Sequence, residues 1–303
     1  MTALRTRIAA QPTVAFFLLA FAMSWTLMAP AMVAGLDSLA ALPFFLGVWA
    51  PAAAAAIVVR VTGGSIKAWL RDIMGWRVRA RYYVLALGFP IALAVVASAG
   101  FALAGERLDF GLVGERAAAF LPLLVFCLFV NGGPEEPAWR GFALPRLQER
   151  YSPVRATVVL GTIWGLWHLP LLLVEDNVDH DLAALAFAGM LVWTLAGFTA
   201  YAFTYTYLWN RTRSALLCML LHASYNTALG VVILRPADEL IGGAYVAISL
   251  ALTGTLWLVA IGLIAATRGR LGLAPDSGRI AAASRSDRGR RAAEPARRPA
   301  PVS

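Results

Sequence analysis

Two adjacent glutamates and an arginine follow the end of an uncharged stretch of the chain. Residues 117–130 carry no charge, and Glu135, Glu136 and Arg140 come just after them in NGGPEEPAWRGF. On a helix, Glu136 and Arg140 share one face and can pair, whereas Glu135 is turned about 100° away. Glu135 is therefore the candidate for chemistry, and the Glu136–Arg140 pair is the candidate for holding the helix end. The alternative is one ion-pair cluster with no catalytic role.

Two histidines lie inside other apolar stretches. His168 follows Trp164 by four residues in GTIWGLWHLP, and His222 precedes Asn226 by four residues in HASYN. This spacing places each pair on one helix face, so an indole borders one imidazole and an amide accompanies the other. Ionisable groups within membrane spans are rare and mark functional sites or buried pairs. Taken alone, each histidine is more often a hydrogen-bonded structural group.

Together these side chains supply what peptide-bond hydrolysis requires. A glutamate in an apolar site offers a general base, and positioned donors in a dry pocket stabilise an oxyanion. Glu135, His168 and His222 are also a set of ligands that can hold zinc with one position left for water. Since the sequence has no HExxH motif, its residues leave both a zinc site and a metal-free site open.

The elements that position these residues are predicted to be membrane-spanning helices. Hydrophobic residues make up 60% of the chain and charged residues 14%, whereas a soluble domain has roughly 25% charged residues. Because a span needs about 20 apolar residues, we expect an all-α polytopic membrane protein with about eight transmembrane helices. Their expected ranges are 12–34, 39–59, 82–104, 117–134, 156–174, 182–208, 214–234 and 243–266. His168 fits a shared site least well in depth, unless a kink at Pro170 or a deep cavity reconciles it.

The distribution of charge in the loops predicts the orientation of the chain. With eight spans, most Lys and Arg residues outside the spans fall on one side, and the other side carries acidic loops, one of which contains His180. By the positive-inside rule, both termini are cytoplasmic. Residues 62–81 place apolar side chains at helical spacing among basic ones, which favours a helix in the cytoplasmic interface over an ordinary loop. The N-terminal apolar stretch is too long for a signal core and is read as the first span.

Composition divides the chain into four parts. They are N-terminal transmembrane helices (1–60), a core that carries the motifs (60–235), a last transmembrane helix (243–266) and a basic cytoplasmic tail (268–303). The tail lacks the apolar residues for a core, so we expect it to be disordered and to meet anionic lipid rather than nucleic acid. Cys127 and Cys218 lie in predicted spans without metal or redox spacing and are expected to be packing residues.

Three motifs in series carry a family resemblance. EEPAWR matches EExxxR, WGLWH is similar to FxxxH with Trp164 in place of the phenylalanine, and HASYN matches HxxxN. Over residues 60–230 the chain resembles the CAAX-protease and bacteriocin-processing (CPBP, or Abi) family of intramembrane proteases. The resemblance implies that Glu135 activates water with His168 beside it, while His222 and Asn226 stabilise the oxyanion. The family has been described both as metalloproteases and as metal-free glutamate proteases.

The expected function is therefore that of an intramembrane endopeptidase of the cell membrane, which cleaves a membrane-associated peptide or protein with a Glu-activated water. Zinc held by Glu135, His168 and His222 stays open beside a metal-free mechanism. The expected partners are the substrate and the lipid bilayer, with no nucleic acid. Two alternatives remain: a non-catalytic membrane scaffold or bacteriocin-immunity protein, and a transporter that relays protons, for which the sequence lacks the expected repeated halves.

Overall fold

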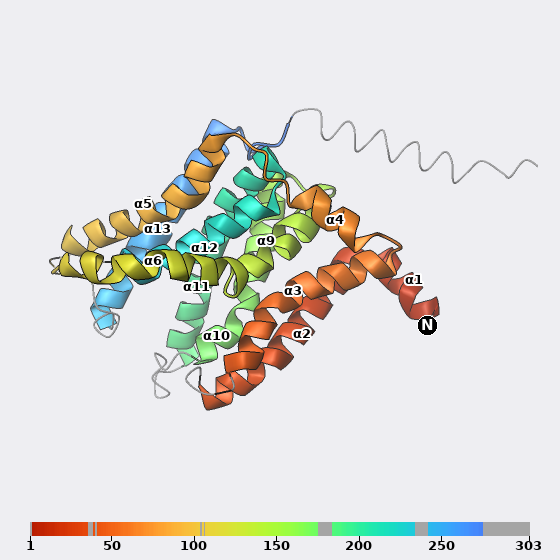
Figure 1. The fold of residues 1–303 in the computed structure, drawn as a ribbon, viewed down its shortest axis with the longest axis horizontal. Helices are drawn as coiled ribbons and strands as arrows, with labels where there is room; N and C mark the ends of the chain where they lie inside the picture. Colours follow the sequence, from red (N-terminus) through yellow and green to blue (C-terminus); the bar gives the residue numbers. More distant parts are fainter. Residues whose placement is uncertain are drawn as a thin grey trace, which may run out of the picture.

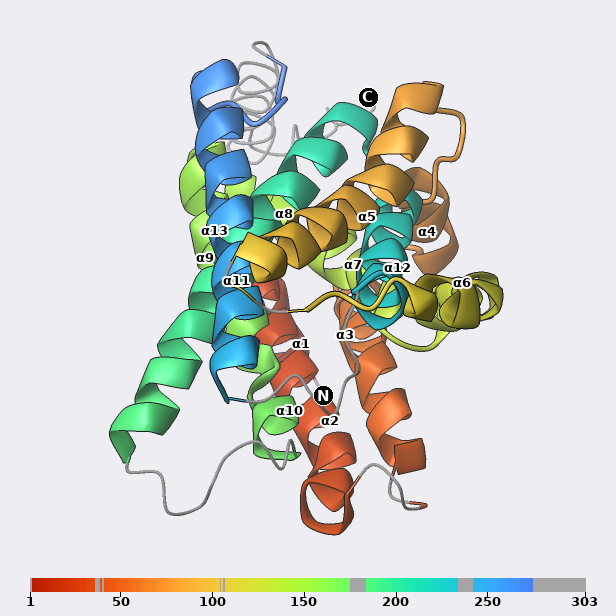
Figure 2. The same ribbon diagram turned by 90° about the vertical axis from the view of Figure 1, so that its left-hand side faces the viewer.

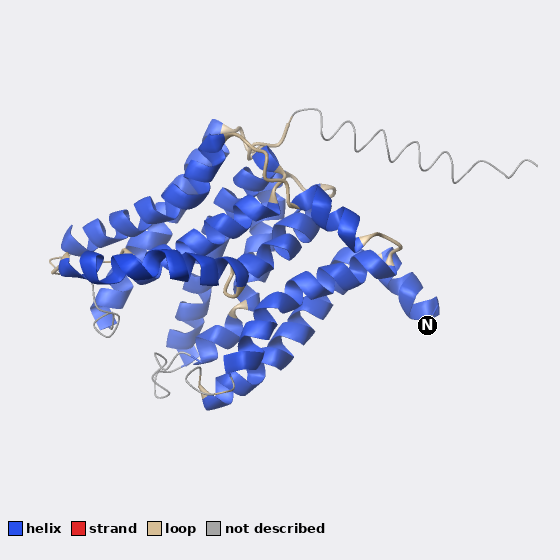
Figure 3. Ribbon diagram, in the orientation of Figure 1, coloured by secondary structure: helices blue, strands red, loops and turns tan. Residues whose placement is uncertain are grey.

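The structure is a computed structural model, and it describes residues 2–35, 39, 41–103, 105, 107–174, 184–233 and 242–274. These segments are mainly helical, and no strand occurs among them (Figure 3). The predictions for the acidic loop with His180 and for the tail beyond residue 274 lie outside the described residues.

The helices follow the apolar stretches of the sequence. In chain order they are α1 (Thr2–Ala10), α2 (Pro12–Ala34), α3 (Ala41–Val61), α4 (Ile66–Ile73), α5 (Ala80–Leu103), α6 (Gly111–Phe129), η1 (Gly133–Glu135), α7 (Glu136–Ala138), η2 (Trp139–Ala143), α8 (Leu144–Gln148), α9 (Pro153–Trp167), α10 (Leu169–Val174), α11 (Ala184–Thr212), α12 (Ala215–Val231) and α13 (Gly242–Ala266). Helix is the form that lets an apolar segment satisfy its own backbone hydrogen bonds inside a bilayer.

The prediction of an all-helical, multi-pass membrane protein is confirmed. Within the described residues, six helices are long and apolar enough to cross a membrane, and each overlaps a predicted span. The two remaining predicted spans form shorter helices. The span at 214–234 is α12, with 17 residues, and the span at 156–174 is divided into α9 and α10 at His168. Of the two possibilities considered for His168, a kink at Pro170 or a deep cavity, the structure has a break in the helix, because the ring of a proline disfavours helical continuation just before it.

The helices form three groups that surround the motif-bearing segment. Figure 1 shows α2 and α3 as a pair on one side, α5 and α13 on the other, and α9, α11 and α12 between them. Helix α6 crosses the molecule at a steep angle to most of the others, as the turned view in Figure 2 also shows. The segment from η1 to α8 follows α6 and runs into the middle of these groups, where it contacts α3, α9, α11 and α12.

Small and hydroxylated residues allow the helices to approach closely. Between α2 and α3, the hydroxyl of Ser24 donates to the carbonyl oxygen of Gly47 at 3.0 Å. Between α9 and α11, the hydroxyl of Thr157 donates to that of Thr206 at 2.8 Å, and a Cβ at Gly161 would stand only 2.7 Å from the backbone of Thr199. Helices in membranes pack through such small residues and through hydrogen bonds between helices.

The predicted amphipathic helix is present but shorter than residues 62–81. Helix α4 covers Ile66–Ile73, and the hydroxyl of Ser65 caps it by accepting from the backbone N–H of Ala68 at 3.3 Å. Part of its apolar face packs on protein: Ile73 is buried, and the indole of Trp69 donates to the carbonyl oxygen of Gly141 at 3.3 Å. Helix α4 therefore supports the segment that carries Arg140, and its place in the membrane interface stays a prediction.

Candidate active site

The backbone around the glutamates changes helix type three times within a few residues. Gly132 has φ 96°, in the left-handed region that favours glycine. A 3₁₀ turn (η1), a single α turn (α7) and a π-helix (η2) follow before α8 begins. Pi-helical turns are rare and occur frequently at functional sites. The sequence did not predict this irregular stretch, which buries the side chains of Glu135, Glu136 and Arg140.

Glu136 is the centre of a buried ionic network. The guanidinium of Arg140 donates through Nη1 to both carboxylate oxygens of Glu136, at 2.9 Å each. The Nδ1 of His222 lies 2.9 Å from Oε1 of the same carboxylate. The predicted pair four residues apart is therefore present. The structure adds His222 to it, across 86 positions of sequence.

Aromatic rings enclose the charge of Arg140. Its guanidinium carbon lies 4.2 Å from the ring centre of Trp164 and 3.9 Å from that of Tyr205. Its Nη2 is buried and has no hydrogen-bond partner among the described residues. Because the faces of aromatic rings attract cations, the two rings partly compensate for the solvation that Arg140 loses on burial. Arg140 is thus held by one carboxylate and two rings.

Glu135 makes its hydrogen bonds with other partners than this ionic network, as its rotation on the helix predicted. Its Oε2 accepts hydrogen bonds from the indole of Trp139 at 3.1 Å and from the indole of Trp164 at 2.8 Å. In the described part of the chain no hydrogen bond reaches Oε1. One oxygen is therefore fixed by two donors, and the other is free for a water molecule or a substrate.

His168 caps the end of α9. Its Nδ1 lies 2.8 Å from the carbonyl oxygen of Trp164, and its ring stacks on Phe198 with centroids 4.1 Å apart. A carbonyl oxygen only accepts, so Nδ1 carries the proton, and Nε2 of the neutral ring is an acceptor. Trp164 thus connects the two residues, since it donates to Glu135 and accepts from His168.

His222 and Asn226 both border Gly132. A Cβ on Gly132 would stand 2.6 Å from Nε2 of His222 and 2.8 Å from Nδ2 of Asn226, so only glycine fits there. The amide of Asn226 donates to the carbonyl oxygen of Asn131 at 3.3 Å. Since Nδ1 of His222 faces an acceptor, its Nε2 is the nitrogen on the side of Gly132 and Asn226.

One cavity collects the four residues that the sequence singled out for chemistry. It has a volume of about 690 Å³ and is lined by Glu135, His168, His222 and Asn226. Most of its other lining residues are apolar or aromatic, and they come from helices on several sides, among them Phe45 of α3 and Leu252 of α13. Ligand sites are typically apolar cavities of this size with a few convergent polar groups. Glu136 and Arg140 are not among its lining residues, but Glu136 contacts the lining residue His222.

The residues predicted as zinc ligands do not form a ready metal site in this structure. Within the described residues, no three His, Cys, Asp or Glu side chains are grouped closely enough to hold a metal ion. One oxygen of Glu135 accepts hydrogen bonds from two indoles, and Nδ1 of His222 contacts the carboxylate of Glu136. Zinc binding by these residues therefore stays a prediction.

Several residues of the site were not singled out from the sequence. Trp139 follows Glu135 by four residues, so helical spacing could have found it. Gly132 lies in the NGG sequence that precedes the glutamates, which is a signal for an irregular backbone. Tyr205 carries no such signal, because it lies on α11 and reaches Arg140 only through the packing of that helix.

Fold and site together define a multi-pass, all-helical membrane protein with a buried Glu–Arg–His network beside a largely apolar cavity. Residues 117–228, which contain all three motifs, match the family described as Type II CAAX prenyl endopeptidase Rce1-like. The chain is also 33% identical, over 92 residues, to CAAX prenyl protease 2 of Methanococcus maripaludis.

That alignment covers 30% of this chain and 34% of the relative, so the chain matches about a third of the relative's length. The motif-bearing part of the chain is therefore similar to CAAX prenyl endopeptidases. The sequence-based resemblance is confirmed.

Proposed function

We propose that the chain is an intramembrane endopeptidase that cleaves a membrane-associated peptide or protein by means of a water molecule activated by Glu135. The observation that supports this most directly is the convergence of Glu135, His168, His222 and Asn226 on one largely apolar cavity. The match of residues 117–228 to the family described as Type II CAAX prenyl endopeptidase Rce1-like supports the same class of reaction.

Glu135 and His168 are arranged to bind and deprotonate water. Two indoles hold Oε2 of Glu135, which directs Oε1 to the attacking water as general base. His168 offers Nε2 as a second acceptor, because its Nδ1 is occupied by the carbonyl oxygen of Trp164. As the water oxygen attacks the scissile carbonyl carbon, its proton passes to Glu135. The protonated carboxyl then donates that proton to the departing amine.

His222 and Asn226 are proposed to stabilise the negative oxygen of the tetrahedral intermediate. Asn226 supplies an amide N–H. His222 donates through Nδ1 to Glu136, so it needs a second proton on Nε2 to donate to the oxyanion as well. The carboxylate of Glu136, 2.9 Å from Nδ1, fixes the orientation of the ring. In a pocket shielded from water, the hydrogen bonds from such donors strengthen as the carbonyl oxygen of the substrate becomes charged.

The cavity lining favours a substrate with a large apolar group. Helices α2, α3 and α13 contribute apolar side chains to the cavity, among them Met28, Phe45 and Leu256. A volume of about 690 Å³ is far more than a single water and a peptide carbonyl require. We propose that this space receives an apolar side chain or an attached apolar chain next to the scissile bond. The relative's name, CAAX prenyl protease 2, is consistent with that proposal.

The test compares membrane peptides in cells that express the wild type, Glu135→Gln or Glu115→Gln. Glu115 is exposed on α6, so its variant controls for the same chemical change away from the site. We expect peptides or proteins to accumulate uncut with Glu135→Gln and to be processed normally with Glu115→Gln. Full processing of an identified substrate by purified Glu135→Gln would contradict the proposed role of Glu135.

A further inference from the structure

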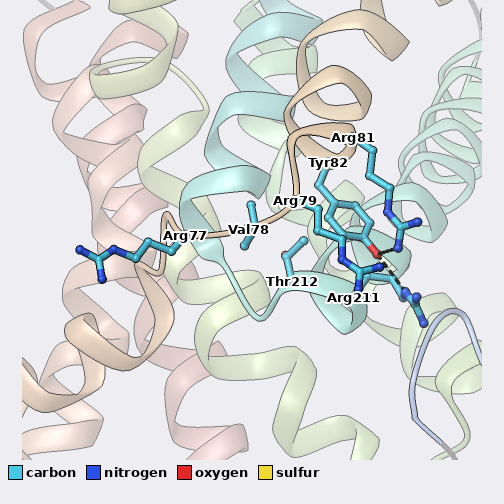
Figure 4. A pocket seen from close by; sticks show the side chains of 7 residues that line it. All are labelled: Arg77, Val78, Arg79, Arg81, Tyr82, Arg211 and Thr212. Atoms are coloured by element: carbon cyan, nitrogen blue, oxygen red, sulfur yellow. Dashed lines mark hydrogen bonds between the residues drawn. The ribbon is translucent and has the colours of Figure 1, made fainter.

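A second cavity, separate from the candidate active site, is lined mainly by arginines. It has a volume of about 380 Å³ and lies between the start of α5 and the end of α11. Its charged and polar lining residues are Arg77, Arg79, Arg81, Tyr82, Arg211 and Thr212. Figure 4 shows Arg79, Arg81 and Arg211 around the hydroxyl of Tyr82, whereas Arg77 points away. None of these residues lines the cavity of the candidate active site.

The hydroxyl of Tyr82 is the centre of this cluster. Its oxygen accepts from Nη2 of Arg81 at 3.0 Å and from Nε of Arg211 at 3.1 Å. The side chain is buried, with 6% of its surface exposed. In the described part of the chain no acceptor is found for the hydroxyl proton of Tyr82. This O–H therefore remains as a donor beside two cations.

The arrangement brings together like charges on exposed arginine side chains, and no described carboxylate forms an ion pair with them. Two guanidinium donors on one oxygen lie within about 6 Å of each other, where their charges repel. No ion pair joins Arg77, Arg79, Arg81 or Arg211 to a carboxylate among the described residues. An anion bound between these side chains would offset the repulsion and accept from the free N–H and O–H groups.

The position of the cluster indicates where that anion comes from. Arg81 and Tyr82 begin the candidate span Ala80–Leu103, and Arg211 lies at the end of the candidate span Phe187–Thr212. The ends of spans lie at the level of the lipid headgroups, whose phosphates are the nearest dense anions. Arg211 is also held in place, because Gly272 packs so closely on its stem that a Cβ there would stand 2.6 Å from Cδ.

We propose that Arg81, Arg211 and the hydroxyl of Tyr82 form a binding site for the phosphate group of a membrane phospholipid, with Arg79 adding charge at its edge. Arginine suits this ligand because its planar fork of N–H groups matches the oxygens of a phosphate. The site anchors the ends of α5 and α11 to one headgroup. It is independent of the reaction proposed for the other cavity.

The test measures binding of short-chain phosphatidic acid and of inorganic phosphate to the full chain in a non-ionic detergent. The variants are Arg211→Gln, Arg81→Gln and Tyr82→Phe, with Arg155→Gln as the matched control, since Arg155 is exposed at the start of α9. The basic tail is present in every variant and contributes equally. We expect phosphatidic acid to bind Arg211→Gln and Arg81→Gln about tenfold or more weakly than the wild type, the usual effect of losing one charge-assisted hydrogen bond.

The proposal is supported if Tyr82→Phe also weakens binding, Arg155→Gln changes it less than about twofold, and inorganic phosphate binds much more weakly than the lipid. If inorganic phosphate binds the wild type as tightly as phosphatidic acid does, and Arg211→Gln loses this binding, the site binds phosphate but its assignment to lipid is wrong. Equal losses in Arg211→Gln and Arg155→Gln, or no saturable binding of either ligand, would overturn the site. Arg81→Gln decides the matter if Arg211→Gln does not fold.

Discussion

Replacing Glu136 by glutamine tests whether the ionic network holds the candidate site together. In the wild type, both oxygens of Glu136 accept from Arg140, and one of them also faces His222. Glutamine keeps one acceptor oxygen but turns the other into an NH₂ group, which faces the donor of Arg140. The substitution therefore removes the negative charge and replaces a hydrogen bond with two opposed donors.

The structure sets the size of the effect. Glu136 is 0% exposed and Arg140 is 1% exposed, so water cannot solvate the remaining guanidinium. Leaving one member of a buried ion pair unpaired costs about 3–5 kcal/mol. The rings of Trp164 and Tyr205 still contact Arg140, which places the expected loss of unfolding free energy at the lower end, about 3 kcal/mol.

Glu135→Gln is the matched control, because it makes the same chemical change one residue earlier. Its amide oxygen can take the place of Oε2 and accept from both indoles, while its NH₂ group faces the cavity. We expect its unfolding free energy to stay within about 1 kcal/mol of the wild type. The two variants should therefore lose different properties: Glu136→Gln loses stability, and Glu135→Gln loses activity.

The assay is equilibrium unfolding in mixed micelles with a rising fraction of SDS, followed by tryptophan fluorescence. Both variants and the wild type are measured in the same detergent. If Glu136→Gln lowers the free energy of unfolding by less than about 1 kcal/mol, the reasoning is refuted, because a buried and unpaired Arg140 must destabilise the protein by more than that. An equal loss in both variants would also refute it, since their hydrogen-bond partners differ.

Three further predictions concern the donors of the site and the orientation of the chain. Trp164→Phe removes the 2.8 Å hydrogen bond to Glu135 but keeps a ring over Arg140. Turnover should therefore fall about tenfold, as expected for the loss of one hydrogen bond to a charged group. A folded variant with no turnover at all would contradict this. Asn226→Ala should lower turnover by roughly 10²- to 10³-fold, and elemental analysis should find its metal content unchanged. If the wild type instead contains stoichiometric zinc, and His222→Ala loses it, the zinc ligand set is favoured. A reporter fused after Ser303 should indicate the cytoplasm, and an external signal there would overturn the predicted orientation.

Much of the fold could be predicted because membrane helices are specified locally. Each apolar stretch must satisfy its own backbone hydrogen bonds in a bilayer, so its length and position follow from the sequence. The predicted ranges therefore overlap the observed helices. The break at His168 was predicted only as a kink or a deep cavity, because proline marks where a helix is weakened but not how the chain continues. The short α12 was expected as a full span, since its apolar sequence runs past the end of the helix at Val231.

The sequence by itself determined which residues of one helix face the same way. Helical periodicity reaches four residues along the chain, so the Glu136–Arg140 pair, the rotation of Glu135 and the shared face of His222 and Asn226 followed from spacing.

Only the tertiary structure decided how helices far apart in sequence meet. It placed His222 on Glu136, the indole of Trp164 on Glu135, and Tyr205 over Arg140. These contacts depend on the rotation and crossing of whole helices, which are set by packing over their full length. No short stretch of sequence contains that information.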